Sequence, residues 1–275
     1  AGAQAFERRD GKYLVIHGGG LTTSSIVDAS GYASTVAGPT VVASNAGTVA
    51  FRRPEGRYFF TNGGANTTQL YDPVYNTFMT GPTLTTGTAG AGALWMQSAT
   101  SSALLVVGGA TGNTQLYNAN TGTGNIGAFS AGPSLGTGCE INGSGSVAFR
   151  RPDGKYIVLS KANASTIYDP VLNTFTCRTS NGPATALGDG AHAIPLQNRT
   201  VLVIVGGGST ASYIYNPNTD TFTAHGTALT AVTTGGHSFQ RPDGTWQILS
   251  GLNTTTNNFD TGLPMTGSAT RWTSD

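Results

Sequence analysis

Four arginines recur at one position of a repeated motif, and together they could bind an anion. Each stands two residues before an acidic residue that is followed by glycine, as in FRRPDGKY at 149–156. A guanidinium group binds carboxylate or phosphate through paired N–H donors, so several at one mouth of a channel would hold an anionic ligand. The alternative, which we favour, is that each arginine pairs with a carboxylate such as Asp72 or Asp169 of a neighbouring repeat. The four residues are Arg8, Arg53, Arg151 and Arg241.

Two histidines, His192 and His237, also share a repeat position and could bind a metal ion or line a central channel. A metal site needs three or four converging ligands, and acid–base catalysis needs converging carboxylates or a nucleophile beside a base. Most acidic residues here occupy repeated turn positions instead, and there is no G-x-S-x-G motif. We therefore lean towards a protein that is not an enzyme, expect no metal or cofactor, and interpret the histidines as channel-lining. The acids outside the repeat are Glu7, Asp28, Glu140 and Asp189.

The chain has two cysteines, Cys139 and Cys177, which make one pair and not a disulfide framework. A disulfide between them and two free thiols are both open interpretations. Five N-x-S/T sequons could accept N-linked sugars in a secreted protein, although most are expected by chance in a sequence this rich in Asn and Thr. They begin at Asn66, Asn142, Asn163, Asn198 and Asn253.

All these residues belong to an internal repeat. Four stretches share an aromatic residue, an acid–glycine pair and an apolar run, and they lie at 6–17, 51–62, 149–160 and 239–250. Two further stretches, SATSSALLVVGG (98–109) and LQNRTVLVIVGGG (196–208), have the same form without the acid–glycine pair. The result is six units with a period of about 45 to 49 residues, which is typical of a β-propeller when the units consist of strands.

Each unit carries signals for four antiparallel strands. An alternating segment such as GTVAF (47–51) predicts the first strand, and the acid–glycine pair predicts a hairpin turn with glycine at positive φ. QLYDPVYNTF (69–78) predicts a third strand that ends at proline and a fourth that follows it. We predict an all-β fold, a six-bladed β-propeller of four-stranded antiparallel blades with the first strand innermost. The chain is then one domain, with blades at about 1–44, 45–87, 88–138, 139–188, 189–232 and 233–275.

Composition excludes several classes of partner. Only 10% of residues are charged and the net charge is +1, so the chain lacks the basic face that nucleic acid requires. No apolar run approaches the ~20 residues of a membrane span. A surface rich in Thr, Ser and Asn and poor in Lys favours an extracellular or cell-surface location. The first residue is Ala and not Met, so we expect a processed chain or part of a longer one.

The chain resembles the kelch-repeat family of β-propellers, especially the bacterial kelch-like variety, whose blade pattern is shared with the galactose-oxidase propeller. The Asp-Gly turn, the Tyr-Asp-Pro and Asn-x-Phe strings, and the diglycines Gly108-Gly109 and Gly206-Gly207 carry this resemblance. It implies a propeller but no single function, because such propellers serve as enzymes, adaptors and ligand binders. Kelch-like copper oxidases hold copper with two histidines and two tyrosines, one of which is cross-linked to cysteine. This sequence has no matching Tyr–Cys constellation, so we expect no copper.

We interpret the protein as a non-enzymatic extracellular interaction or structural module, a subunit or repeating unit of a surface or secreted assembly. The predicted outer strands, such as NTFMTGP (76–82), carry few charges, and exposed strand edges need protection from unwanted pairing. Sugars or another copy of the chain could cover them. The alternative is a carbohydrate-binding or carbohydrate-active propeller with its ligand over the channel mouth. Four tyrosines at one repeat position could stack on sugars but are expected in the core: Tyr71, Tyr117, Tyr168 and Tyr215.

Overall fold

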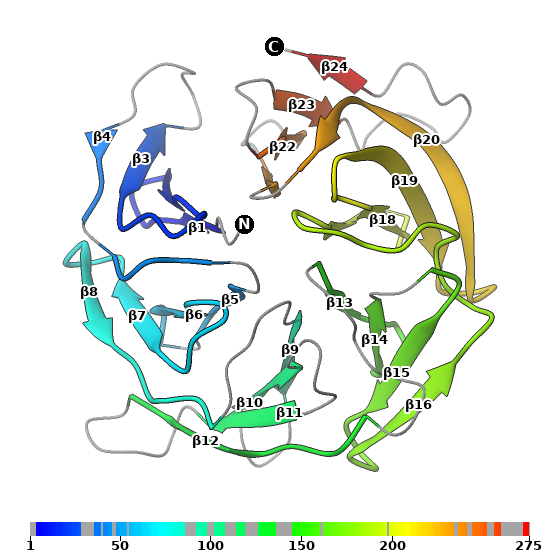
Figure 1. Ribbon diagram of the computed structural model, residues 1–275, viewed down its shortest axis with the longest axis horizontal. Helices are drawn as coiled ribbons and strands as arrows, with labels where there is room; N and C mark the ends of the chain where they lie inside the picture. Colours follow the sequence, from blue (N-terminus) through cyan, green and yellow to red (C-terminus); the bar gives the residue numbers. More distant parts are fainter. Residues whose placement is uncertain are drawn as a thin grey trace.

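A computed structural model shows the chain as antiparallel β-sheets arranged around a central axis (Figure 1). The residues it describes form strands and turns and contain no helix. The expectation of an all-β, antiparallel propeller arrangement is confirmed. The described residues are 4–28, 36–39, 41–45, 48–53, 55–85, 92–97, 102–107, 114–118, 126–135, 145–159, 162–196, 198–233, 236–240, 244–251, 256–259 and 272–274.

The strands of the described residues pair into six four-stranded sheets, which we number in chain order. Sheet 1 contains β1 (Gln4–Glu7), β2 (Lys12–Ile16), β3 (Ser24–Asp28) and β4 (Val36–Ala37). Sheet 2 contains β5 (Ala50–Arg52), β6 (Tyr58–Thr61), β7 (Thr68–Asp72) and β8 (Thr77–Thr80). Sheet 3 contains β9 (Gly92–Gln97), β10 (Ser102–Val107), β11 (Thr114–Asn118) and β12 (Ala128–Ala131).

The second half of the chain repeats this arrangement. Sheet 4 contains β13 (Val147–Arg150), β14 (Tyr156–Leu159), β15 (Ser165–Asp169) and β16 (Thr174–Arg178). Sheet 5 contains β17 (His192–Pro195), β18 (Val201–Ile204), β19 (Ser209–Asn216) and β20 (Thr221–Val232). Sheet 6 contains β21 (His237–Gln240), β22 (Trp246–Leu249), β23 (Thr256–Phe259) and β24 (Trp272–Ser274).

The hairpin turn between the first two strands has the chemistry that the sequence predicts. In sheet 4 the amide of Arg151 donates to the carbonyl of Lys155 at 2.7 Å, and the amide of Gly154 donates to the carbonyl of Arg151 at 3.1 Å. Asp153 Oδ1 accepts from the amide of Lys155 at 3.1 Å. Gly154 has a φ of 84°, a conformation that costs glycine little. The repeated acid–glycine pair is therefore a turn requirement that each of these hairpins meets separately.

The first strands of the sheets surround the axis and contact one another. β5 contacts β9, β9 contacts β13, β13 contacts β17, and β17 contacts β21. β21 in turn contacts β1, so the ends of the chain meet across the same kind of interface. Tyr13 Oη of sheet 1 donates to the carbonyl of Gln240 of sheet 6 at 2.6 Å. Sheets 1 and 6 are thus joined by side-chain contacts, with each sheet built from its own segment of the chain.

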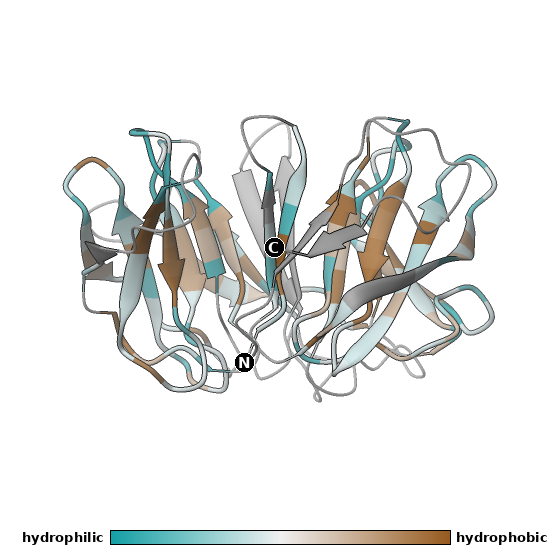
Figure 2. Ribbon diagram, turned by 90° about the horizontal axis from the view of Figure 1, so that it is seen from above, coloured by the Kyte–Doolittle hydropathy of each residue, from teal (hydrophilic) through white to brown (hydrophobic). Residues whose placement is uncertain are grey.

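The hydrophobic core lies between neighbouring sheets. Figure 2 shows hydrophobic residues concentrated in the strands and hydrophilic ones at the turns. One cluster joins Phe6, Leu14 and Ile16 of sheet 1 to Phe60 and Tyr71 of sheet 2. The four repeated tyrosines are at most 1% exposed and pack in such clusters, so they belong to the core and are not a sugar-stacking surface: Tyr71, Tyr117, Tyr168 and Tyr215.

The described part of the chain holds no helix of the length and hydropathy that crossing a membrane would need.

Candidate functional site

Arg8 joins sheet 1 to sheet 2. Its Nη1 donates to Tyr71 Oη at 2.8 Å and to Asn76 Oδ1 at 2.6 Å, and its Nη2 pairs with Asp10 at 3.1 Å. Asn76 lies in the turn between the third and fourth strands of sheet 2 and has a φ of 54°. The guanidinium of Arg8 is therefore held by three groups, and its side chain is only 13% exposed.

Arg53 occupies the corresponding place between sheets 2 and 3. It pairs with Glu55 at 2.5 Å, and its guanidinium carbon lies 5.9 Å from the centre of the Tyr117 ring. Arg53 is 4% exposed. A cation over an aromatic face is attracted by the negative face of the ring, so Arg53 also serves the contact between sheets.

Arg151 joins sheet 4 to sheet 5 through a denser network. It pairs with Asp153 of its own turn at 3.2 Å and with Asp220 of sheet 5 at 3.1 Å. Asp220 also accepts from Arg178 and from Tyr215 Oη, both at 2.7 Å. Burial raises the pKa of Tyr215, and the hydrogen bond to Asp220 raises it further. Burial opposes the lowering of the Asp220 pKa, but the bonds from Tyr215 and Arg178 prevail and the pKa is lowered.

The prediction that Asp72 and Asp169 pair with the repeated arginines was wrong. Asp72 pairs with Arg57 at 3.1 Å and Asp169 pairs with Lys155 at 2.9 Å, in each case within one sheet. The reason is strand register: Tyr58 pairs with Tyr71 and Tyr156 with Tyr168, which places each basic residue opposite the acid at the end of the third strand. Arg8, Arg53 and Arg151 each pair with the acid of their own turn, and Arg151 also pairs with Asp220 of the neighbouring sheet 5. Arg241 lies outside the described residues.

His192 and His237 do lie together, at the start of adjacent inner strands, with ring centres 6.4 Å apart. His192 Nδ1 hydrogen-bonds the carbonyl of Gly190 at 2.8 Å, and His237 hydrogen-bonds the backbone of Ala5 in sheet 1. Burial lowers the pKa of both histidines to about 4. His192 Nε2 is buried without a hydrogen-bond partner. The pair is therefore neutral at physiological pH and lies where sheets 5, 6 and 1 meet.

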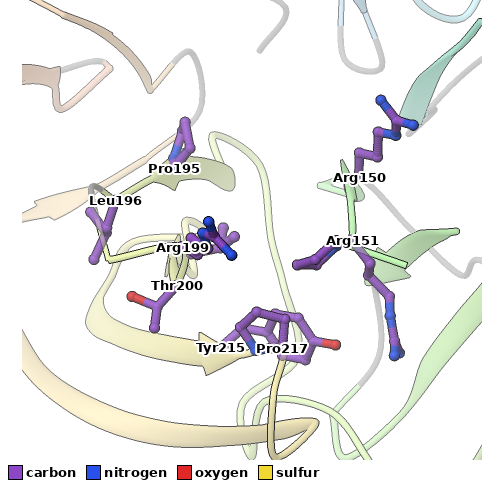
Figure 3. Close-up of a pocket in the computed structure, with 10 residues that line it drawn as sticks. Arg150, Arg151, Pro195, Leu196, Arg199, Thr200, Tyr215 and Pro217 are labelled. Carbon is purple, nitrogen blue, oxygen red and sulfur yellow. The ribbon is translucent and has the colours of Figure 1, made fainter. Parts of the chain in front are cut away.

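A cavity of about 380 Å³ opens between sheets 4 and 5 (Figure 3). Residues 150–152 of sheet 4 form one wall, and the hairpin turn and third strand of sheet 5 form the other. The described residues that line the cavity include no carboxylate. In Figure 3, Arg199 lies above Tyr215 and Pro217, whereas the guanidinium of Arg150 extends away from them.

Side chains at the start of the second strand explain why this interface is open. In sheet 2 that position is Tyr58, whose ring stacks on Phe6 at 4.8 Å and whose Oη donates to the carbonyl of Glu7 at 2.5 Å. In sheet 1 it is Tyr13, which bridges to sheet 6 in the same way. In sheet 5 it is Val201. A tyrosine side chain that fills the gap at two other interfaces is thus replaced by a much smaller one here.

Sequence reasoning missed Arg199, although the sequence contained the signal. Arg199 stands where the other hairpin turns have glycine, as the hydrogen bond from its amide to the carbonyl of Leu196 at 3.1 Å shows. Its φ is 65°, a conformation that costs non-glycine residues about 1 kcal/mol. The repeat requires positive φ at this position, and an arginine there indicates a functional role for its side chain.

Cys177 forms a disulfide, and the sequence has one other cysteine, Cys139, which lies outside the described residues. The sequon residues Asn66, Asn163 and Asn198 are exposed. Asn142 and Asn253 lie outside the described residues.

Comparison with known proteins supports the fold. No family model and no curated protein matches the sequence. Among solved structures, a fungal alcohol oxidase of the AA5 family in complex with copper is similar, with a TM-score of 0.58 and 14% sequence identity. The chain is a β-propeller. The match covers 97% of this propeller and 59% of the oxidase, so the propeller corresponds to little more than half of that protein.

Among the described residues, the histidine, cysteine and acidic side chains do not gather into a site for copper. In the described part of the chain, no three side chains among His, Cys, Asp and Glu lie close enough to hold a metal ion together. His192 and His237 each have one ring nitrogen committed to a backbone carbonyl or backbone group. The Cys177 sulfur is engaged in a disulfide and is not available for a cross-link to tyrosine.

Proposed function

We propose that this propeller is a non-enzymatic extracellular interaction module that packs against copies of itself. Its six sheets are the blades of one ring that spans residues 1–275. The contact surfaces are two separate turns between the third and fourth strands of sheets 2 and 4, which we call the rim turns (residues 72–76 and 169–173). The single observation that carries the proposal is that these turns present large apolar side chains to solvent.

Two adjacent apolar residues stand at the tip of each rim turn. Val74 and Tyr75 are 55% and 77% exposed, and Val171 and Leu172 are 89% and 68% exposed. Burying such a side chain contributes about 1.5–3 kcal/mol, so the two on each rim turn could drive association once a partner covers them. Contiguous exposed apolar patches commonly mark interaction surfaces, and the two adjacent side chains of each rim turn form such a patch.

The rim turns hold these side chains in a defined position. Asp72 Oδ1 accepts from the amides of Val74 and Tyr75 at 2.9 and 3.4 Å. Asp169 Oδ1 accepts from the amides of Val171 and Leu172 at 3.0 and 3.1 Å. Because the turn is already ordered, binding through its tip costs little conformational entropy.

Sheet 5 provides an internal reference for the rim turns. Its turn is built in the same way, since Asn216 Oδ1 accepts from the amide of Asn218 at 3.0 Å. The residues at its tip are Asn218 and Thr219, which are polar. The turn geometry therefore does not require apolar residues at the tip, and their presence in sheets 2 and 4 calls for another explanation.

Two further observations support an extracellular, non-enzymatic role. The disulfide of Cys177 is stable in oxidising compartments such as the extracellular space. The described arginines of the repeat, which could have bound a ligand, are committed to contacts between sheets. We propose that Cys139 is the partner of Cys177, and that the exposed sequons remain available for sugars.

Sedimentation velocity of purified protein tests the proposal. The wild-type chain should sediment faster as its concentration rises through the micromolar range. A variant with Val171→Asn and Leu172→Thr, which copies the tip of sheet 5, should remain monomeric or associate at least tenfold more weakly. The matched control is Asn218→Ser with Thr219→Ser, which should associate as the wild type does. A wild-type chain that stays monomeric at all concentrations would contradict the proposal.

A carbohydrate-binding propeller, with the ligand over the channel mouth, is the second candidate. The observation in its favour is the likeness to an alcohol oxidase, an enzyme class that acts on hydroxyl compounds. Binding of a soluble neutral oligosaccharide that is abolished by substitutions at His192 and His237, with the rim-turn variant binding normally, would favour this candidate over self-association.

A further inference from the structure

We infer that the cavity between sheets 4 and 5 binds a small six-membered ring that carries a carboxylate, with the ring in the place of the missing tyrosine and the carboxylate on Arg199. This site is independent of the rim turns. The ring could come from a phenolic acid or from a uronic acid sugar, since both offer a ring of that size, a hydroxyl group and a carboxylate.

The shape of the cavity favours a ring. At the interface of sheets 1 and 2, the Tyr58 ring fills this space and stacks on Phe6 at 4.8 Å. With Val201 in its place, sheet 5 leaves about 380 Å³, within the range of small-molecule sites. The cavity walls include Pro152, Pro195 and Pro217, whose flat apolar faces suit a ring that lies between them.

The carbonyl of Arg150 lies where it could accept a hydrogen bond from a hydroxyl group on the ring. Tyr58 Oη donates to the carbonyl of Glu7, and Tyr13 Oη donates to the carbonyl of Gln240, each at the end of a first strand. The equivalent residue of sheet 4 is Arg150, which pairs with Tyr156 as Glu7 pairs with Tyr13. Arg150 lines the cavity. A ring hydroxyl in the tyrosine position would reach its carbonyl in the same way.

The charges around the cavity favour an anion. Arg151 and Arg178 are balanced by Asp153 and Asp220 through ion pairs of 2.7 to 3.2 Å. Arg199 is exposed, and among the described residues it has no carboxylate within ion-pair distance. It is therefore an uncompensated cation at the edge of a partly apolar cavity, where it can donate charge-assisted hydrogen bonds to a carboxylate.

The backbone conformation of Arg199 also indicates that its side chain has a function. Gly154 and Gly11 occupy the turn position of Arg199 in sheets 4 and 1, with φ values of 84° and 75°. At 65°, Arg199 keeps a conformation that glycine would adopt without strain. Retaining an arginine where glycine would be more stable indicates that its side chain has a use, and residues under such strain cluster at ligand sites.

Isothermal titration with two probes tests the site on the intact chain. We expect 4-hydroxyphenylacetate, D-galacturonate or both to bind with a Kd of roughly 1 mM, the scale for a ligand of this size. The uncharged analogues 4-hydroxybenzyl alcohol and D-galactose should bind at least tenfold more weakly. Binding of one acid alone identifies its class as the source of the ring.

Three variants separate this site from nonspecific effects. Arg199→Gln removes the charge and leaves the N-x-T sequon intact, and it should weaken binding of the acid at least tenfold. Arg9→Gln removes an exposed arginine from another hairpin turn and should leave binding unchanged. Val201→Tyr introduces the tyrosine found at two other interfaces and should abolish binding while the urea midpoint stays equal to or above that of the wild type.

Three results would overturn the inference. The first is that neither acid binds at about 10 mM. The second is that Arg199→Gln and Arg9→Gln weaken binding equally. The third is that a folded Val201→Tyr variant binds as the wild type does. None of these results would bear on self-association through the rim turns, which sedimentation measures separately.

Discussion

Protonation of the partly buried pair His192 and His237 should destabilise the propeller as the pH falls below neutrality. His192 and His237 lie where sheets 5, 6 and 1 meet, and burial lowers the pKa of each to about 4. Replacing both with asparagine removes the titration and keeps an N–H donor for the backbone carbonyls. The perturbation therefore isolates the charge from the hydrogen bonds.

The sign and size follow from the two pKa values. In the unfolded chain a histidine has a pKa of about 6.5, so above that pH both states are neutral and stability is complete. Between pH 6.5 and 4 the unfolded state binds more protons, and stability falls with pH. A difference of one unit between the unfolded and folded pKa values changes the free energy of unfolding by about 1.36 kcal/mol, so each histidine can lower it by about 3 kcal/mol. The repulsion from His192 is part of the lowering for His237, so the pair contributes less than twice that value.

Urea unfolding from pH 7.5 to pH 5 measures the effect. This window avoids the carboxyl groups, since the pKa values of Asp10, Asp72, Asp169 and Asp220 are all lowered from 3.8. The wild type should lose about 2 kcal/mol or more by pH 5, whereas the double asparagine variant should lose little. The control is His17→Asn, which changes a histidine that hydrogen-bonds Thr23 and Ser25 in sheet 1. Equal losses in the wild type and the double variant would mean that the two histidines do not cause the loss of stability.

Three further changes test the contacts between and within sheets. Tyr58→Phe removes the hydrogen bond to Glu7 and should cost about 1 kcal/mol of unfolding free energy, measured by urea. Gly81→Ala should cost about 1–3 kcal/mol, because the new Cβ would lie 2.4 Å from Thr68 Oγ1; a melting temperature equal to the wild type would contradict this. Asp220→Asn should lower the melting temperature, since two arginines lose their shared carboxylate, and 0.5 M salt should narrow the difference.

The repeat made the turns predictable because their chemistry is local. Each turn needs an acid that accepts from the amide two residues later and a glycine at positive φ, as Asp153 and Gly154 show. Such a pair can be recognised from a few adjacent residues of the sequence. The glycine–proline pairs at the ends of the outer strands are also explained locally. A side chain at Gly81 or Gly132 would collide with a threonine hydroxyl of the third strand.

The partners of the arginines were not predictable because they depend on how neighbouring sheets are placed. Arg8 reaches Tyr71 and Asn76, which lie more than sixty residues away. The cavity between sheets 4 and 5 could not be predicted from the repeat, because it arises where one unit departs from the others. It depends on Val201 in place of tyrosine, which matters only once the Tyr58 ring is seen to fill the gap between two sheets.

Amide hydrogen exchange at two protein concentrations would show whether copies of this propeller pack through the rim turns. Raising the concentration above the association range should slow exchange at residues 72–76 and 169–173. The polar turn at residues 216–220 should exchange at the same rate at both concentrations. Exchange in the rim turns that does not change with concentration, while the protein associates, would contradict the claim and place the interface elsewhere.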